Sequence, residues 1–309
     1  MHSAQSAVLC DAIEIGVLQL KKSLSVDDVV AQAMQGIDKN EARRLVQDAL
    51  GVAMMRAKCC SQGYPFEASL NYIAPRQTDN FDPYLFLLFG YALKRSSVPG
   101  GDKFARRFDR YFEDLVCWSF KRFGFTACVL SEPREERGLP KSLKPALVHI
   151  ANLFGEPISI HEDRLKPNDN DLDVDVIASP AVIDRTRCGG LSVFLQCTTR
   201  PVEQLKVKMN EGFNLFSSVW NNGFFLATSI RAGATPEDLL TLDTVDWVRL
   251  SQTGWVLDRM RLVELFRLGI MKGFEEPQVV LTLWKDLEAV LPDFDWRNDW
   301  RQADDKQDN

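Results

Sequence analysis

The sequence predicts an α+β or α/β protein, in which a mixed central sheet is flanked by helices and preceded by a helical N-terminal domain. Two apolar runs with strand character, 173–178 (DVDVIA) and 191–197 (LSVFLQC), lie close together in the chain. A turn-rich link containing adjacent glycines joins them, which favours a hairpin. A helical stretch and a third apolar run, 223–230, follow. This strand, helix, strand order implies a right-handed crossover within a mixed sheet.

The composition is that of an ordinary globular protein. Of 309 residues, 45% are hydrophobic and 26% are charged, which is enough to build a substantial core. The formal charge of -6 excludes a generally basic nucleic-acid coat, so any DNA contact must come from a local patch. We find neither a membrane-length apolar run nor a signal-peptide pattern. The seven cysteines form no CxxC pair, so we expect reduced thiols, no zinc and a cytoplasmic location.

The N-terminal part of the chain has helical patterns throughout. The boundary signal is the turn-rich SSVPGG at 96–101. We therefore predict a helical N-terminal domain over 1–98, a second domain over 99–270, and a C-terminal helix with a polar tail over 271–309. The stretches in the first domain that favour helix are 7–20, 26–38, 39–57 and 83–93, the last opening with a proline.

The second domain is expected to open with a helix over 104–123, whose aromatic and aliphatic residues recur at helical spacing. Glu113 lies in this helix, either as a functional acid or as a surface charge paired with Arg110. The later elements are expected to be a strand at 124–129, a charged loop at 131–145, an amphipathic helix at 255–269 and a last helix at 277–291.

Polar residues accompany the two central strands at positions where packing does not require them. Asp173 and Asp175 belong to the first run and Gln196 to the second. Strand alternation places the two aspartates on one face, and the hairpin register could bring Asp175 beside Gln196. Burying two carboxylates together is costly unless they share a cation. Oxygen donors on adjacent strands therefore predict a Mg²⁺ site.

Two other interpretations of the acidic stretch 168–175 (NDNDLDVD) remain open. It could be a solvated turn that enters a strand, in which case the carboxylates need not converge. A calcium-binding loop of the EF-hand type is the second alternative, although the central glycine and terminal glutamate of that pattern are absent. Neither alternative requires the alternation that puts Asp173 and Asp175 on the same face.

The order of these motifs resembles the core of the PD-(D/E)xK, or restriction-endonuclease-like, nuclease superfamily. Over roughly 104–265, a strand with Asp175 precedes a strand with Gln196, and a helix follows. The chain is similar to Mrr-type and defence-associated relatives that have a Gln-Cys pair and a lysine about ten positions later. Thr198 stands where the family most often has lysine, and Lys206 fits the later position. Helical spacing lets only one of Lys206 and Lys208 face the site, and we expect Lys206.

The resemblance implies a site in which Asp175, Gln196, the carbonyl of Cys197 and Glu113 hold Mg²⁺ or Mn²⁺. Lys206 would position or activate the attacking water. The implied activity is that of a metal-dependent DNA endonuclease in prokaryotic antiphage defence or restriction. A protein partner, such as an ATPase, and a homo-oligomer are further expectations, and no membrane is implied. Because Thr198 replaces the usual lysine, an inactive nuclease fold serving as a DNA-binding or assembly module is the alternative.

Overall fold

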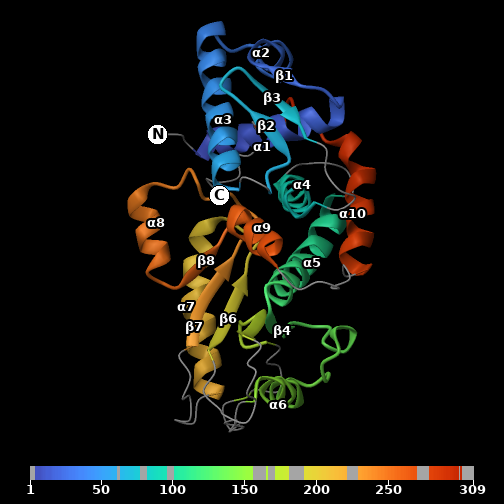
Figure 1. Cartoon of the computed structure of the whole chain (residues 1–309), viewed down its shortest axis with the longest axis vertical. Coiled ribbons are helices and arrows are strands. Elements are labelled where there is room, and N and C mark those ends of the chain that lie inside the picture. Colours follow the sequence, from blue (N-terminus) through green and yellow to red (C-terminus); the bar gives the residue numbers. More distant parts are fainter. Residues whose placement is uncertain are drawn as a thin grey trace.

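The computed structural model of the chain has N-terminal helices followed by a five-stranded mixed sheet packed against helices (Figure 1). This is the predicted α+β architecture. The residues that the structure describes are 4–60, 63–76, 82–95, 101–155, 165, 171–180, 191–220, 229–269, 278–298 and 300. No helix in these ranges is both long and apolar enough to cross a membrane.

The N-terminal helices form where the sequence predicts them. Ser25 caps α2 in a reciprocal capping box with Asp28, and the carboxylate of Asp38 caps α3. Each cap satisfies backbone N–H groups that have no partner within the helix, which fixes where the helix begins. The elements are α1 (Ala4–Leu20), α2 (Val26–Ala33), α3 (Lys39–Cys59) and α4 (Pro83–Arg95).

We predicted an entirely helical N-terminal domain, and this prediction is wrong. A small antiparallel sheet of order β1-β3-β2 lies within it. Its strands have two to four residues, β1 (Leu24–Ser25), β2 (Phe66–Ala68) and β3 (Tyr72–Pro75), too short to display an alternating pattern. Among the described residues, no strand of this region joins the central sheet, which agrees with the predicted separation.

The central sheet has the order β4-β5-β6-β7-β8. Strands β4, β5 and β6 are antiparallel neighbours, whereas β7 and β8 continue parallel to β6. The predicted hairpin pairing and the crossover through α7 are thus confirmed. The elements are α5 (Gly101–Arg122), β4 (Phe125–Val129), α6 (Leu143–Phe154), β5 (Val176–Pro180), β6 (Ser192–Cys197), α7 (Val202–Trp220), β7 (Ser229–Ala234) and β8 (Trp255–Leu257).

Three sequence predictions need correction or lie partly outside the described ranges. The helix expected at 255–269 divides into strand β8 and helix α9 (Arg259–Leu268), because Asp258 caps α9 between them. Only the end of the strand expected at 223–230 is described, within β7. The link 181–190 and the tail 301–309 are outside the described residues. The remaining helices are α8 (Thr244–Ser251) and α10 (Gln278–Val290).

Helices cover both faces of the central sheet (Figure 1). Helices α5 and α9 pack on one face, where Val176, Leu195 and Ala232 point into the main core. On the other face, α6 packs around Ile177 and Phe194, while α7 packs beside β7 and β8. The site described below lies at the end of the sheet where β5 begins and β6 ends.

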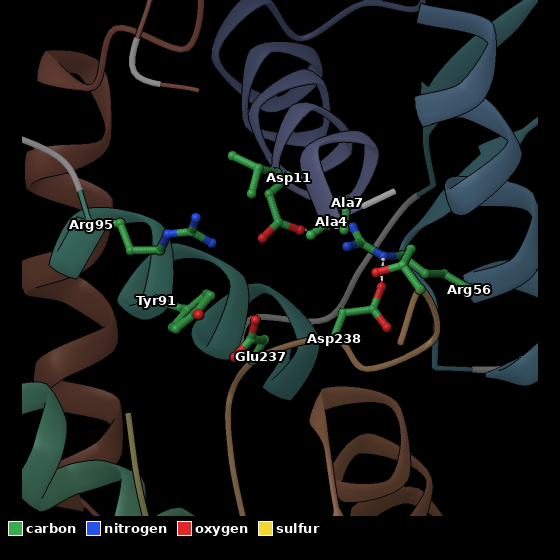
Figure 2. A pocket seen from close by; sticks show the side chains of 10 residues that line it. Ala4, Ala7, Asp11, Arg56, Tyr91, Arg95, Glu237 and Asp238 are labelled. Atoms are coloured by element: carbon green, nitrogen blue, oxygen red, sulfur yellow. Dashed lines mark hydrogen bonds and ion pairs between the residues drawn. The ribbon is translucent and has the colours of Figure 1, made fainter. Parts of the chain in front are cut away.

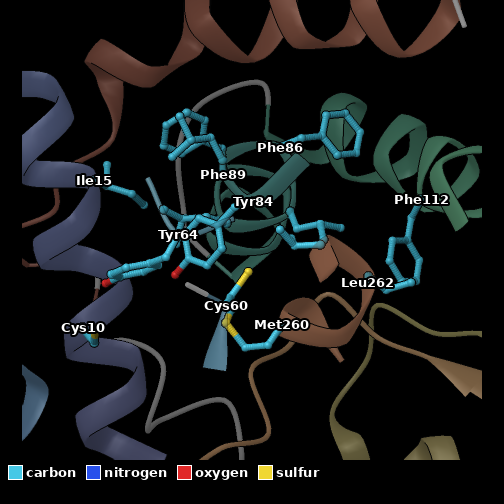
Figure 3. Close-up of a cluster of buried hydrophobic side chains, with 14 of the residues drawn as sticks. Cys10, Ile15, Cys60, Tyr64, Tyr84, Phe86, Phe89, Phe112, Met260 and Leu262 are labelled. Carbon is cyan, nitrogen blue, oxygen red and sulfur yellow. The ribbon is translucent and has the colours of Figure 1, made fainter. Parts of the chain in front are cut away.

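The main core extends without interruption from the N-terminal helices to the sheet. One contiguous set of buried side chains includes residues of α1, α3, α4, α5, the sheet, α9 and α10. Figure 3 shows part of it, where Tyr84 of α4 lies on the side of α1 and Phe86 of α4 lies toward α5. Because burial of shared apolar surface stabilises both parts together, the N-terminal region is a lobe on the same core, and we expect the two to unfold cooperatively.

Candidate functional site

Asp175, Gln196 and Cys197 lie at the end of the sheet where β6 ends and β5 begins. Val176 of β5 faces Leu195 of β6, and Asp175, which precedes β5, donates its backbone N–H to the Leu195 carbonyl at 2.9 Å. The backbone N–H of Cys197 donates to the Asp175 carboxylate at 2.6 Å. Gln196 is only 4% exposed. Asp175 and Gln196 thus lie at the same end of this strand pair, and the convergence of their side chains stays a prediction.

Glu113 reaches this edge from helix α5. Its carboxylate accepts a hydrogen bond from the Ser131 hydroxyl, just after β4, and pairs with Arg137 at 3.3 Å. Burial, and then the nearby charge of Asp175, raise the pKa of Glu113 to about 8. The electrostatic influence of Asp175 shows that the two carboxyl groups share one environment. This agrees with the functional interpretation of Glu113 and not with a solvated charge paired to Arg110.

The surroundings of Asp175 also disfavour the charged form of its carboxyl group. Burial raises its pKa to about 7, and the charge of Asp171 acts in the same direction. The hydrogen bond from Cys197 N–H and the charge of Lys208 oppose this rise without cancelling it. Burial is thus the main cause that raises the pKa of both carboxyl groups, Asp175 and Glu113, and it disfavours their charged forms.

Asp173 does not accompany Asp175 as the alternation had predicted. Leu172 and Asp173 adopt left-handed backbone conformations, with φ of 55° and 56°, and β5 begins only at Val176. Asp173 is exposed, and its N–H donates to the Asp171 carboxylate at 3.0 Å. Strand alternation therefore does not extend back to Asp173. The additional acid that acts on Asp175 most strongly from this segment is Asp171.

The cation beside Asp175 is Lys208 and not the expected Lys206. Lys206 is exposed on α7, whereas Lys208 is half-buried. The charge of Lys208 lowers the pKa of both Asp175 and the Cys197 thiol. Helix α7 begins at Val202, and adjacent α7 residues are rotated by about 100° about its axis. Lys206 and Lys208 therefore lie on different sides of α7, and the charge that acts on Asp175 is that of Lys208.

Thr198 has a local structural role. It is 2% exposed, its N–H donates to the Ala234 carbonyl at 2.9 Å, and its hydroxyl accepts from Arg200 N–H at 3.2 Å. These contacts tie the turn after β6 to the end of β7. Thr198 therefore helps to fix the backbone at the end of β6.

Arg137 is a site residue that the sequence did not reveal. The segment 131–145 suggested a solvated loop, but the side chain of Arg137 is only 8% exposed and forms ion pairs with Glu113 at 3.3 Å and Asp114 at 2.9 Å. It also donates to the Ser131 carbonyl and hydroxyl. Arg137 thereby orients Glu113. No spacing signal marks such a contact, because the two residues belong to separate elements.

The donor set fits a hard divalent cation. In the described part of the chain, no group of three or more His, Cys, Asp or Glu side chains lies close enough to hold a metal. The site instead offers the carboxylates of Glu113 and Asp175 with the amide of Gln196. Mg²⁺ is commonly held by one or two carboxylates and takes its remaining ligands from water and substrate phosphate. A bound cation would favour the charged forms of the two carboxyl groups, which burial disfavours. The carbonyl of Cys197 stays a predicted ligand.

Comparison with known proteins adds no assignment. No family model matches the chain, and no curated protein or solved structure matches it with significance. The argument for a function must therefore come from the site itself.

The metal-free site should lower the stability of the protein as pH rises. The pKa of Glu113 is raised from its ordinary 4.5 to about 8, so between these values the folded protein retains a proton that the unfolded chain releases. Stability then falls with increasing pH across this window. In Glu113→Gln, which cannot ionise, we expect less of this loss, by roughly 1–3 kcal/mol near pH 8.5. Urea unfolding in EDTA at about pH 5 and 8.5 measures it, and parallel profiles for both proteins would contradict it.

Proposed function

We propose that the protein is a metal-dependent phosphodiesterase that cleaves DNA. The observation that carries the proposal is that Glu113 and Asp175, from separate elements, influence each other electrostatically. Burial disfavours the charged forms of both carboxyl groups, and a bound cation would stabilise these forms. Gln196 adds a neutral oxygen beside them. The order of a helix with Glu113, a strand with Asp175, a strand with Gln196 and a helix with the lysine is that of the suggested nuclease superfamily, and this supports the proposal.

Each residue has a definable role in such a reaction. Asp175 and Glu113 would bind Mg²⁺ or Mn²⁺, with the Gln196 amide and the Cys197 carbonyl completing the protein ligands. The ion would supply Lewis acidity at the phosphoryl group and lower the pKa of a bound water. Lys208 would stabilise negative charge that develops on the phosphate in the transition state. Because Gln196 is neutral, the negative charge that attracts the ion comes mainly from the two carboxylates.

An inactive nuclease fold that binds DNA or assembles with a partner is the second candidate. Thr198, with its structural contacts, is the observation that favours it. The half-buried Lys208 favours the active site, because its charge acts on the carboxyl group of Asp175. The biological setting that we propose, from the resemblance alone, is antiphage defence or restriction, with a protein partner such as an ATPase and possible self-association.

Substitution of the two lysines of α7 tests the proposed role of Lys208. In Lys208→Met we expect the rate of plasmid cleavage with Mg²⁺ or Mn²⁺ to fall roughly a hundredfold, because a cation that stabilises transition-state charge is lost. The matched control is Lys206→Met, whose side chain is exposed on the same helix and whose rate should stay within about twofold. Nicking of supercoiled plasmid, with EDTA as the blank, measures both. A larger loss of cleavage rate in Lys206→Met than in Lys208→Met would mean that Lys206 is the lysine of the site, as the sequence predicted.

A wild-type protein that leaves plasmid and linear DNA intact with either ion would contradict the nuclease proposal. Retained DNA binding in that experiment, measured by fluorescence anisotropy with a labelled duplex, would favour the inactive module. The salt dependence of the binding would then report how many phosphates the protein contacts.

A further inference from the structure

A second polar cavity lies between the N-terminal lobe and the central sheet, apart from the carboxylate site. It has a volume of about 30 Å³. Figure 2 shows Asp11 of α1, Tyr91 and Arg95 of α4, and Glu237 and Asp238 around it. The last two follow β7 directly, so the loop at the end of this strand forms one wall. The complete lining consists of Ala4, Ala7, Val8, Asp11, Arg56, Tyr91, Arg95, Glu237, Asp238 and Thr241.

Arg56 presents an unused hydrogen-bond donor in this lining. Its side chain is fully buried. The Nε atom donates to Asp238 at 2.5 Å and Nη1 donates to Glu14 at 2.8 Å. Within the described residues, the buried Nη2 atom has no hydrogen-bond partner. A buried donor without a partner is unfavourable, and more so when it is charged, so a ligand acceptor there would recover free energy.

Glu237 presents an unused acceptor on the same lining. Its Oε2 atom is buried and, in the described part of the chain, lacks a hydrogen-bond partner. A hydrogen bond from Tyr91 holds the side chain. Burial raises the pKa of Glu237 to about 7, which reflects the same shortage of donors. The cavity thus offers one donor and one acceptor whose bonding capacity the protein leaves unfilled.

The charges around the cavity favour a neutral ligand. An anion would meet the carboxylates of Asp11 and Asp238, and a cation would meet the guanidinium groups of Arg56 and Arg95. A cavity of 30 Å³ holds roughly two to three water-sized groups. A carboxamide has three heavy atoms and carries an acceptor beside a donor. Its oxygen would accept from Arg56 and its NH₂ group would donate to Glu237.

We propose that this cavity binds the carboxamide group of a small neutral ligand, between Arg56 of α3 and Glu237 after β7. The recognised chemistry is the adjacent acceptor and donor of the amide, while the rest of the ligand extends toward the mouth of the cavity. Sites between lobes with a few convergent polar groups are common places for small molecules. This proposal is independent of the nuclease activity, because none of its residues belongs to the carboxylate site.

Ligand-observed saturation-transfer NMR with matched probes tests the proposal. Acetamide and nicotinamide carry the carboxamide, and acetate and nicotinate replace it with a carboxylate. We expect either amide to bind the full-length protein at least about tenfold more tightly than its acid, because the acid has no donor for Glu237 and adds negative charge. The two pairs differ in size, so they also report whether the mouth admits a ring.

Two variants locate the binding. Ala7→Leu fills the cavity from α1, and Glu237→Ala removes the acceptor; each should weaken amide binding at least about tenfold. The control is Glu211→Ala, an exposed glutamate of α7, which should bind as the wild type does. Circular dichroism checks that every variant is folded. If neither amide binds the wild-type protein, the cavity holds only water and the proposal is wrong. If both variants bind the amide as tightly as the wild-type protein does, the proposal is also wrong, because the amide then binds elsewhere.

Discussion

In Asp175→Asn we expect metal-dependent DNA cleavage to fall by more than about a hundredfold while the fold stays intact. Loss of a residue that only supports a metal ligand typically costs 10- to 100-fold, so loss of a proposed ligand should cost more. The asparagine oxygen still accepts from Cys197 N–H, which donates to Asp175 at 2.6 Å. The buried negative charge disappears, so the metal-free variant should be at least as stable as the wild type at pH 8. Plasmid nicking and urea unfolding measure these two effects.

The matched control is Asp173→Asn. Asp173 is an acid of the same segment, but it is exposed and turns away from the strand with a φ of 56°. Its removal should leave cleavage nearly unchanged. Equal activity of Asp175→Asn and the wild type would refute the site. Equal losses in both variants would mean that the negative potential of the whole acidic segment matters, and not ligation by Asp175.

The parts of the site that the sequence predicted depend on strand pairing. Asp175 and Gln196 flank two apolar runs joined by a short link, and a hairpin has few registers that keep both apolar faces buried. The pairing of β5 with β6 was therefore predictable. Glu113 was less certain, because helical spacing leaves a polar residue on an apolar helix equally suited to solvent. Only the packing of α5 against β4 decides that it is buried.

The parts that were mispredicted depend on backbone details that composition does not encode. The left-handed residues Leu172 and Asp173 interrupt the alternation that had placed Asp173 beside Asp175. The choice between Lys206 and Lys208 depends on the rotation of α7, which is set by Leu205 and Met209 packing against the sheet. A side-chain rule applied to an assumed strand or helix start fails when the start moves by one or two residues.

The N-terminal lobe is joined to the sheet by buried ion pairs that periodicity could not reveal. Arg56 of α3 is fully buried and contacts Glu14 of α1 and Asp238 after β7. Arg259, the first residue of α9, forms a bidentate ion pair with Asp11 of α1. Its Nη1 and Nη2 atoms donate to the two carboxylate oxygens at 2.8 and 2.9 Å. The first residue of α9 thus takes part in a structural ion pair. These pairs connect α1, α3, α9 and the loop after β7 in one network.

We expect Arg56→Met to be the most destabilising single substitution of this network. Methionine keeps much of the volume of the arginine stem, but it leaves the carboxylates of Glu14 and Asp238 without their cation. Glu14 retains hydrogen bonds from Tyr64 at 2.5 Å and Tyr84 at 2.7 Å, which do not neutralise its charge. Breaking a buried pair in this way typically costs about 3–5 kcal/mol. Chemical denaturation at neutral pH measures the loss.

The matched control for this prediction is Arg43→Met, the same substitution on the same helix. Arg43 pairs with Asp27, but the two side chains are 42% and 73% exposed. Water and salt screen such a pair, so its loss should cost less than about 1 kcal/mol. The difference between the two variants isolates the effect of burial, since residue type, helix and charge change are identical. If Arg56→Met cost no more than Arg43→Met, the carboxylates of Glu14 and Asp238 would have to take up protons or water without penalty. The network could then not be what fixes the N-terminal lobe on the sheet.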